Sequence, residues 1–157
     1  MKIDLDIEKK LRDLDIKLPT PPNPVASYVP FIKTQNLIFI SGQICFLGED
    51  KTFKGKIGDN LSTQDGYNAA KNCCINTLSQ LKMACDGNLS TVSRCINLKV
   101  FVACVPSFCD HPKVANGASD LIKDIFADSG EHSRSAIGCT SLPMDSAVEI
   151  ESIWETY

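Results

Sequence analysis

Apolar side chains recur at helical spacing in three stretches of the chain, and this pattern predicts three helices. The first is an amphipathic helix near the N-terminus, with an apolar face formed by Ile3, Ile7, Leu11 and Leu14. It ends before the proline-rich segment 19–24, because proline cannot continue a helix. We expect this segment to cross the surface in an extended form.

The other two predicted helices lie in the middle of the chain and carry start and stop signals. Ser62 and Asp65 form a capping box at the start of the second helix, and Gly87 is a natural stop. Its apolar face consists of Tyr67, Ala70, Cys74, Leu78 and Leu81. The third helix has Pro112 in its first turn and Gly130 at its end. Its buried stripe consists of Val114, Ala118, Leu121, Ile122, Ile125 and Phe126.

Four shorter segments have the pattern of strands. A buried apolar strand covers 36–42, where Gly42 stops it, and two further strands at about 135–142 and 147–155 end the chain. Between the helices, residues 95–104 alternate, with Ile96, Leu98, Val100 and Val102 on one side. This order of elements predicts an α+β sandwich, a mixed sheet with two helices packed on one face, in addition to the N-terminal helix.

Two helices cover only one face of such a sheet, so the opposite face must meet solvent or a partner. On the last predicted strand, Glu149, Glu151 and Ile153 point to that opposite face, where Phe101 joins them. A face that mixes carboxylates with large apolar side chains suits a partly buried subunit interface. We therefore expect an oligomer.

Composition and charge argue against several classes of protein. The 157 residues amount to one domain, and sixteen basic against nineteen acidic residues leave a net charge of -3. The lysines are scattered, whereas proteins that bind nucleic acid usually show a basic stripe. No apolar run approaches the ~20 residues of a membrane span, and the acidic N-terminus does not fit a secretory or transit peptide. We expect a cytoplasmic protein without membrane or nucleic-acid partners.

The eight cysteines do not indicate a disulfide framework. Most of them lie within or beside apolar runs, where a free thiol behaves as a small hydrophobe. The chain has no Cys-x-x-Cys motif and no signal peptide. Cys104, Cys109 and His111 could be read as a metal site in a loop, but a fourth ligand at suitable spacing is missing. We expect no metal.

One arginine and two carboxylates near the C-terminus suggest chemistry. Arg134 stands at the mouth of an apolar strand, and Glu149 and Glu151 follow on the next strand, after a turn at Leu142–Pro143. The planar fork of an arginine can grip a small carboxylate, and a glutamate on a neighbouring strand can hold or activate a water molecule. These residues suggest a pocket that handles carboxylates.

A simple hairpin between these two strands would keep Arg134 and Glu149 apart. If 142–146 were a tight turn centred on Met144, Glu149 would lie opposite Cys139. Arg134 would then be five residues further along, roughly 16 Å away. The two side chains could share a small ligand only if the strands were offset or if another subunit completed the site.

Several short motifs are specific when they occur in this order and at these separations. They are Tyr28, Ser41-Gly42-Gln43, Asn116, Ser133-Arg134-Ser135, Leu142-Pro143 and Glu149-Ile150-Glu151. In these motifs the chain resembles the Rid/YjgF family, the reactive intermediate imine deaminases that are also labelled endoribonuclease L-PSP. The resemblance runs from about Pro24 to the end, so we expect an N-terminal helix and proline-rich segment (1–24) and a Rid/YjgF-like domain (25–157). It implies a chorismate mutase-like fold and a homotrimer with clefts between subunits.

The resemblance also implies a reaction, the hydrolysis of reactive 2-imino and enamine acids such as 2-iminopropanoate to 2-keto acids and ammonia. Arg134 would bind the substrate carboxylate and Glu149 would position or activate the attacking water, as the catalytic pair. Tyr28, Gly42, Asn116 and Ala136 would bind the substrate. At Ala136, where the family often has cysteine, only the backbone could contribute. No cofactor or metal is needed, and the implied partners are a small 2-imino or 2-keto carboxylate and further copies of the chain.

Other interpretations use the same residues. A non-catalytic protein could hold a 2-keto acid for sensing or regulation, whereas the acidic charge balance argues against RNA cleavage. Glu149 could be a strand-face carboxylate paired with a lysine, and Tyr28 could pack beneath the proline segment. Asn116 could be an amide on a helix surface. His132, two residues before Arg134, is the histidine worth testing.

Overall fold

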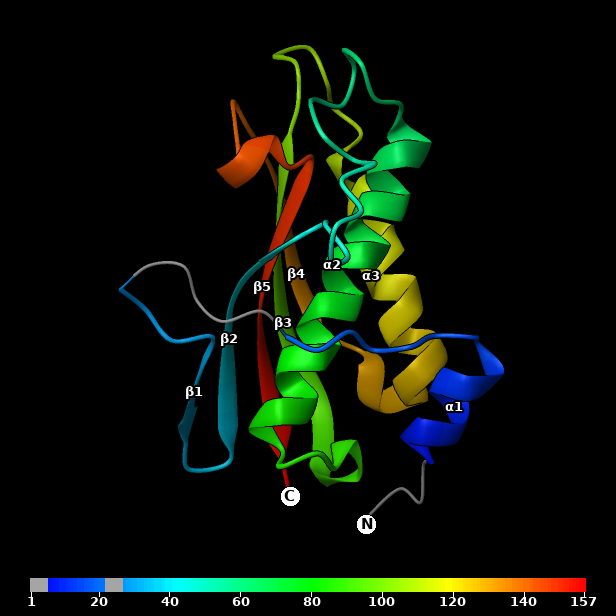
Figure 1. Ribbon diagram of the computed structural model, residues 1–157, viewed down its shortest axis with the longest axis vertical. Coiled ribbons are helices and arrows are strands. Elements are labelled where there is room, and N and C mark those ends of the chain that lie inside the picture. The colour runs from blue at the N-terminus through cyan, green and yellow to red at the C-terminus, as the bar shows by residue number, and fades with distance from the viewer. Residues whose placement is uncertain (1–5, 22–26) are drawn as a thin grey trace.

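The computed structural model describes residues 6–21 and 27–157, in which the chain forms three α-helices and a five-stranded sheet (Figure 1). In chain order the elements are α1 (Ile7–Asp13), β1 (Phe31–Thr34), β2 (Leu37–Ile44), α2 (Thr63–Ala84), β3 (Val92–Ala103), α3 (His111–Phe126), β4 (Ser133–Cys139) and β5 (Val148–Thr156). This order confirms the predicted α+β class. Ile3, predicted on the first helix, and residues 22–26 of the proline-rich region lie outside the described residues.

The sheet is mixed, with the strand order β1-β2-β5-β3-β4. β4 pairs with β3 in parallel, whereas every other neighbouring pair is antiparallel. The tight hairpin considered for 142–146 is therefore wrong, because β3 lies between β4 and β5. A parallel neighbour needs a crossover connection, and α3 supplies it between β3 and β4.

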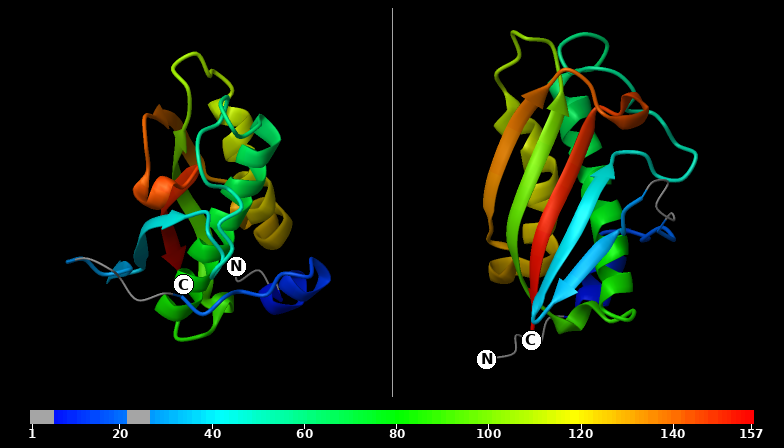
Figure 2. Two further views of the ribbon diagram at one scale, coloured as in Figure 1. Left: turned by 45° about the horizontal axis from the view of Figure 1, so that its top comes forward. Right: turned by 90° about the vertical axis from the view of Figure 1, so that its left-hand side faces the viewer.

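α2 and α3 cover one face of the sheet, and the right-hand view of Figure 2 looks onto the other face. The core lies between the helices and the sheet. Trp154 of β5 is fully buried there, and its ring centroid lies 5.3 Å from that of Phe126 at the end of α3. On β5, Val148, Ile150 and Ser152 are buried on the same side as Trp154, so the intervening residues face away from the helices.

The two long helices begin as their sequence signals predict. Ser62 accepts a hydrogen bond from the backbone N–H of Asp65, and the Asp65 side chain accepts one from the backbone N–H of Ser62, which confirms the capping box. Pro112 lies in the first turn of α3. After α2, Gly87 adopts a φ of 87°, the left-handed conformation that ends helices and favours glycine.

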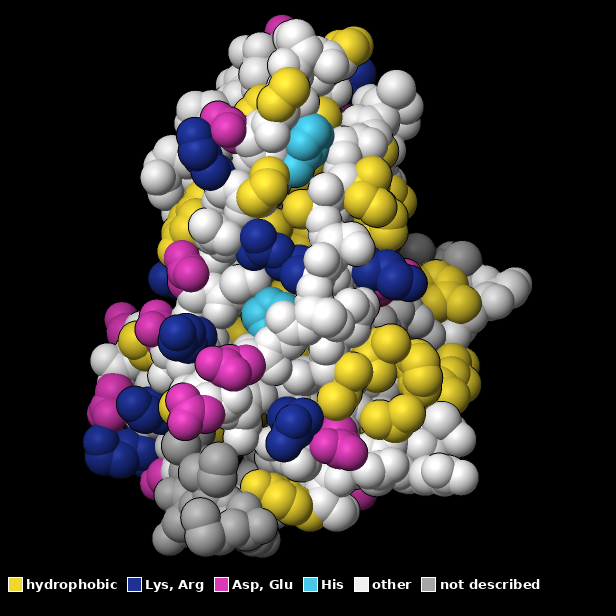
Figure 3. Space-filling view, turned by 180° about the vertical axis from the view of Figure 1, so that it is seen from behind, with side chains coloured by type: hydrophobic (Ala, Val, Ile, Leu, Met, Phe, Trp, Pro, Cys, Tyr) yellow, Lys and Arg dark blue, Asp and Glu magenta, His cyan; other side chains and the backbone are white. Residues whose placement is uncertain are grey.

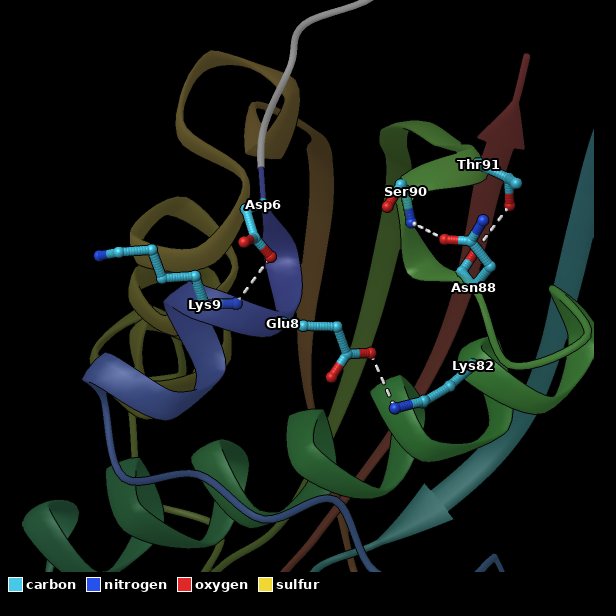
Figure 4. A network of polar contacts seen from close by, with 7 residues as sticks. All are labelled: Asp6, Glu8, Lys9, Lys82, Asn88, Ser90 and Thr91. Atoms are coloured by element: carbon cyan, nitrogen blue, oxygen red, sulfur yellow. Dashed lines mark hydrogen bonds and ion pairs between the residues drawn. The ribbon is translucent and has the colours of Figure 1, made fainter.

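The short α1 helix packs against the body of the protein by its apolar face. Ile7 and Leu11 are buried, and Asp6 caps the helix by accepting a hydrogen bond from the backbone N–H of Lys9 at 2.9 Å. Figure 4 shows this cap and the ion pair between Glu8 of α1 and Lys82 of α2, 2.7 Å apart. Because this ion pair is partly exposed to solvent, the burial of the two apolar side chains holds α1 in place more than the charges do.

Two strands differ from their predicted form. Gly42 does not stop β2, which continues to Ile44 through a bulge between Ile40 and Gln43. A second bulge, between Cys95 and Asn97 of β3, buries Cys95 and leaves Ile96 only partly buried. Strict alternation along the sequence cannot reveal an inserted residue, and this is the reason for the difference at Ile96.

The face opposite the helices carries apolar side chains among charged ones. Phe39 and Ile137 keep 40% and 49% of their surface exposed. Between these two residues, Nζ of Lys99 lies 2.6 Å from a carboxylate oxygen of Glu151. The mixture agrees with the pattern in the sequence, and the oligomer inferred from it stays a prediction.

Candidate functional site

The Arg134 side chain is held against α3 by neutral acceptors. Its Nη1 donates hydrogen bonds to Oδ1 of Asn116 and Oγ of Ser119, both at 2.9 Å, and its Nη2 reaches the carbonyl oxygen of Pro112 at 3.5 Å. Positions 112, 116 and 119 follow one another on one side of α3. Within residues 6–21 and 27–157, no carboxylate forms an ion pair with Arg134. The guanidinium therefore keeps an uncompensated positive charge and free donors for an anion.

Ser119 connects Arg134 to His132. The Nε2 atom of His132 lies 2.9 Å from Oγ of Ser119, and its Nδ1 lies 2.6 Å from the carbonyl oxygen of Gly130. Because a carbonyl can only accept, Nδ1 carries a proton, and Nε2 is left to form the hydrogen bond with the Ser119 hydroxyl. The Ser119 hydroxyl then accepts from Arg134, so one chain of hydrogen bonds runs from Arg134 to Gly130.

Ser119 is the site residue that sequence reasoning missed. It lies three residues after Asn116, which places both on one side of a helix, so helical spacing could have identified it. His132 was singled out only for its closeness to Arg134, and the structure gives it a direct role in the chain of hydrogen bonds.

The residues of β4 that follow Arg134 on the same side are small. Ala136 lies next to Val100 of β3. Gly138 lies beneath His111 and Cys104, where an added Cβ would come within 2.5 Å of Nε2 and 3.0 Å of Sγ. We call this strip the β4–α3 seam, defined by Arg134, Ala136, Gly138, Cys104, His111, Pro112, Asn116 and Ser119. Figure 3 looks onto this side of the molecule, where both histidine side chains reach the surface and basic side chains lie between them.

Glu149 lies on the other face of the sheet. It stands on β5 opposite Ile44 of β2 and Phe101 of β3. Its carboxyl group covers the α-carbon of Gly42, because a Cβ at that position would overlap Oε1 of Glu149. Glycine leaves this space to the Glu149 carboxyl, and a larger residue at position 42 would require that flexible side chain to move.

The Glu149 carboxyl is half-buried, and no described residue forms a hydrogen bond or an ion pair with it. Burial raises its pKa above the ordinary value, and repulsion from the Glu151 carboxylate adds to the rise. The sequence left open whether a lysine pairs with Glu149, and Lys99 pairs with Glu151 instead. A half-buried carboxyl with a raised pKa and no partner is a candidate for proton transfer.

Tyr28 lies on the Gly42 side of the molecule. Its segment is tied to β2 by two hydrogen bonds, from Oγ of Ser41 to the carbonyl oxygen of Val29 at 2.7 Å and from the backbone N–H of Ser41 to Pro30 at 3.0 Å. The Tyr28 side chain is half exposed. Val29, the residue after Tyr28, thus contacts β2 directly, and this contact keeps Tyr28 near the strand that carries Gly42.

The residues predicted from the sequence therefore divide into two groups. We call Arg134, Asn116 and Ala136, with Ser119, the arginine half-site, and Glu149, Gly42 and Tyr28 the glutamate half-site. Arg134 points toward α3, whereas Glu149 points away from the helices, and β3 separates their strands. Neighbouring strands are about 4.8 Å apart, so two strand spacings and the thickness of the sheet separate the two groups in one chain. One subunit cannot bring both to the same small ligand.

The described residues offer no metal site and no membrane span. No group of three or more His, Cys, Asp or Glu side chains in 6–21 and 27–157 could hold a metal ion. All eight cysteines are free, and Cys109 is the one that is exposed. Of the helices that the structure describes, none is long and apolar enough to cross a bilayer.

Comparison of the sequence with known proteins gives one family. Residues 8–154 match the family model described as "YjgF/chorismate mutase-like, putative endoribonuclease". Protein TCP17 of Trypanosoma cruzi is 36% identical over 150 residues, which cover 95% of this chain and 93% of TCP17. The 2-iminobutanoate/2-iminopropanoate deaminase of Dermatophagoides farinae is 24% identical over 139 residues, which cover 88% of this chain and 92% of the deaminase.

Solved structures share the fold. The crystal structure of Atu1372 from Agrobacterium tumefaciens, a protein of unknown function, superposes with a TM-score of 0.90 at 38% identity, covering 96% of this chain and 92% of that one. E. coli TdcF, solved with bound serine, gives a TM-score of 0.62 at 20% identity, covering 88% of this chain and 94% of TdcF. The chain thus has the chorismate mutase-like fold of these proteins.

Proposed function

Because this chain belongs to the YjgF/chorismate mutase-like family, we propose that it hydrolyses small 2-imino and enamine acids, such as 2-iminopropanoate, to 2-keto acids and ammonia. One observation carries the proposal. An uncompensated guanidinium lies in the arginine half-site, and an unpaired, half-buried carboxyl with a raised pKa lies in the glutamate half-site. The first can bind a carboxylate and the second can move a proton, which are the two tasks of this hydrolysis.

The two half-sites belong to different subunits in this proposal. Arg134 of one subunit and Glu149 of its neighbour would meet in a homotrimer, with Tyr28 and Gly42 beside Glu149. The apolar side chains on the open sheet face, Phe39 and Ile137 among them, support an interface there. The neighbour is necessary because the two groups lie on opposite faces of one sheet.

The proposed reaction needs only orientation and a proton relay. Arg134 holds the carboxylate of the substrate, and ionised Glu149 takes a proton from the water whose oxygen attacks the imine carbon. The new C–O bond converts the C=N bond to a single bond. Glu149 returns this proton to nitrogen, which gives a carbinolamine. The hydroxyl proton of the carbinolamine then passes to nitrogen through Glu149 as the C=O bond forms and the C–N bond breaks, so ammonia and the 2-keto acid leave. Neither a metal nor a cofactor takes part in these steps.

Two of the similar proteins support the substrate class. The mite relative is named for the deamination of 2-iminobutanoate and 2-iminopropanoate. TdcF binds serine, a small amino acid that also presents a carboxylate. The word endoribonuclease in the family description favours RNA as a second substrate, but acidic and basic side chains are interspersed on the side of the molecule that Figure 3 displays. RNA binding usually requires a continuous basic surface.

The test is the hydrolysis of imines generated in solution. An amino-acid oxidase produces 2-imino acids, semicarbazide traps what is not hydrolysed, and wild type is compared with Arg134→Ala. We expect wild type to lower the trapped product and Arg134→Ala to lose about 10-fold or more in kcat/KM, since a hydrogen bond to a charged group contributes about 1.5–3 kcal/mol. No acceleration by wild type over buffer, together with saturable 2-ketobutyrate binding, would instead identify a carboxylate-binding protein without this activity.

The pH dependence of kcat/KM is expected to show an acidic limb set by Glu149. Only the ionised carboxyl can take the proton of water, so the rate falls as the pH drops through the raised pKa of Glu149. Glu151→Gln removes the repulsion that adds to this rise, so the limb should move to lower pH while the plateau at high pH stays. Steady-state ammonia release across about pH 5 to 9 measures the limb.

The matched control for this profile is Glu155→Gln. Glu155 lies on the same side of β5, further from Glu149, and pairs with Arg94 at 3.5 Å. This substitution removes the same charge but should leave the acidic limb in place. Equal shifts in both variants would mean that net charge, and not the neighbour of Glu149, sets the limb.

A further inference from the structure

Cys104 and His111 form a pair that the proposed hydrolysis does not use. Cys104 directly follows β3 and His111 begins α3, and Sγ lies 3.5 Å from Nε2. The ring of Phe108 packs edge-on against the imidazole, with centroids 5.2 Å apart and planes at 81°. Gly138 provides the space for both groups, because any Cβ there would press on Nε2 and Sγ. The thiol and the imidazole are therefore held together by packing from two sides.

The pair lies in the β4–α3 seam together with Arg134. Arg134, Ala136 and Gly138 alternate on one side of β4, so the guanidinium and the pair face the same helix. Nη2 of Arg134 is 3.5 Å from the carbonyl oxygen of Pro112, the residue next to His111. Only Ala136 lies between Arg134 and Gly138 on this side of the strand. Four residues of strand, about 13 Å, separate Arg134 from Gly138, and the arginine side chain covers part of this distance because its Nη2 reaches Pro112. Lys56 is a further cation whose charge acts on the Cys104 sulfur.

The Cys104 thiol becomes a nucleophile only when His111 takes its proton. Burial raises the pKa of Cys104, so the sulfur is protonated at neutral pH. The hydrogen bond to Nε2 gives the proton a place to go, and the thiolate left behind is the reactive form. Cys104 retains 9% of its surface, and His111 is partly exposed.

We propose that Cys104 and His111 are a reactive thiol–imidazole site for small electrophiles that carry a carboxylate, which Arg134 directs to the sulfur. With a 2-unsaturated acid, sulfur bonds to the β-carbon, the π electrons move to the α-carbon, and His111 returns the thiol proton there. With a 2-halo acid, the S–C bond forms as the C–halogen bond breaks, halide leaves with the electron pair, and the proton passes from His111 to solvent. Neither step needs an oxidant, a reductant, Glu149 or a second subunit.

Two reagents of almost equal size test the proposal, since iodoacetate carries a carboxylate and iodoacetamide does not. Alkylation rates at each cysteine are measured by peptide mass mapping, with the exposed Cys109 as the internal reference. We expect the iodoacetate-to-iodoacetamide ratio at Cys104 to exceed that at Cys109 by about 10-fold or more, the size of a charge-assisted contact. Arg134→Gln should reduce the Cys104 ratio to that of Cys109, while Arg134→Lys keeps part of the preference.

Two further variants test the role of His111 and the independence of the thiol from Glu149. His111→Gln should slow both reagents at Cys104 alike, because the proton acceptor is lost but the cation stays. Glu149→Gln should leave the labelling unchanged, since Glu149 lies on the other face, so failure here and failure of the imine hydrolysis are distinguishable. Equal ratios at Cys104 and Cys109, a ratio insensitive to Arg134→Gln, or no labelling of Cys104 in folded protein would overturn the proposal. Thermal unfolding of each variant verifies that the labelled protein is folded.

Discussion

A 1:1 mixture of Arg134→Ala and Glu149→Gln subunits is expected to regain about a quarter of the wild-type rate of imine hydrolysis, although each variant alone is nearly inactive. The reason is geometric, because Arg134 and Glu149 lie on opposite faces of the sheet in one chain. If each site takes its arginine from one subunit and its glutamate from the next, half of the arginine half-sites and half of the glutamate half-sites are intact, and about a quarter of the sites combine both.

The measurement requires that subunits exchange. The two variants are unfolded, mixed and refolded together, native mass spectrometry verifies mixed oligomers, and ammonia release is compared with that of wild type at equal concentration. A mixture of Arg134→Ala with Arg134→Gln is the matched control and should stay inactive, because the two share a defect in the same half-site. Mixed oligomers without recovered activity would show that the two half-sites do not combine across subunits.

Gly117→Ala is expected to destabilise the protein by about 3 kcal/mol or more, the upper end for overpacking a core. Gly117 lies where α3 crosses α2, and an added Cβ would overlap the backbone carbonyl oxygen of Tyr67. A flexible side chain could move aside, but a helix backbone cannot move without separating the two helices. Urea unfolding of wild type and variant measures the difference in the free energy of unfolding.

Gly87→Ala is the control for this substitution. An added Cβ at Gly87 meets nothing within 4 Å, so only its left-handed conformation, φ 87°, opposes the change. A left-handed conformation costs a residue with a Cβ about 1–2 kcal/mol. If both variants lost the same stability, the close approach of α2 and α3 would not be the reason for glycine at position 117.

Local signals in the sequence predicted much of the fold. The capping box at Ser62 and Asp65, Pro112 in the first turn of α3 and the buried positions of β5 depend on residues close in the chain, and all three are confirmed. The sequence left open whether the last two strands form a hairpin, because the insertion of β3 between them is a long-range pairing. No short window of sequence contains that information.

For the candidate site too, the residues could be predicted from the sequence, whereas their arrangement in space could not. Arg134 and Glu149 were found by their chemistry and by the resemblance of their surroundings to a family, neither of which requires the topology. Their placement on opposite faces depends on strand order, and so does the contact of Arg134 with Ser119 and, through it, with His132. The bulge beside Gly42, which lets Glu149 cover that residue, has no signal in the alternation of side chains.

Because β3 and β4 pair in parallel, the length of the connection between α3 and β4 determines which way the Arg134 side chain points. Leu98 lies beside Arg134, and the connection 127–132 brings β4 into that register from the end of α3. Side chains alternate along a strand, so a shift of β4 by one residue would exchange its two sides and turn Arg134 away from α3. One residue gained or lost between the helix and the strand would thus move a positive charge from one surface of the molecule to the other. In a relative with a connection of different length, an arginine at the aligned position need not face the same ligand.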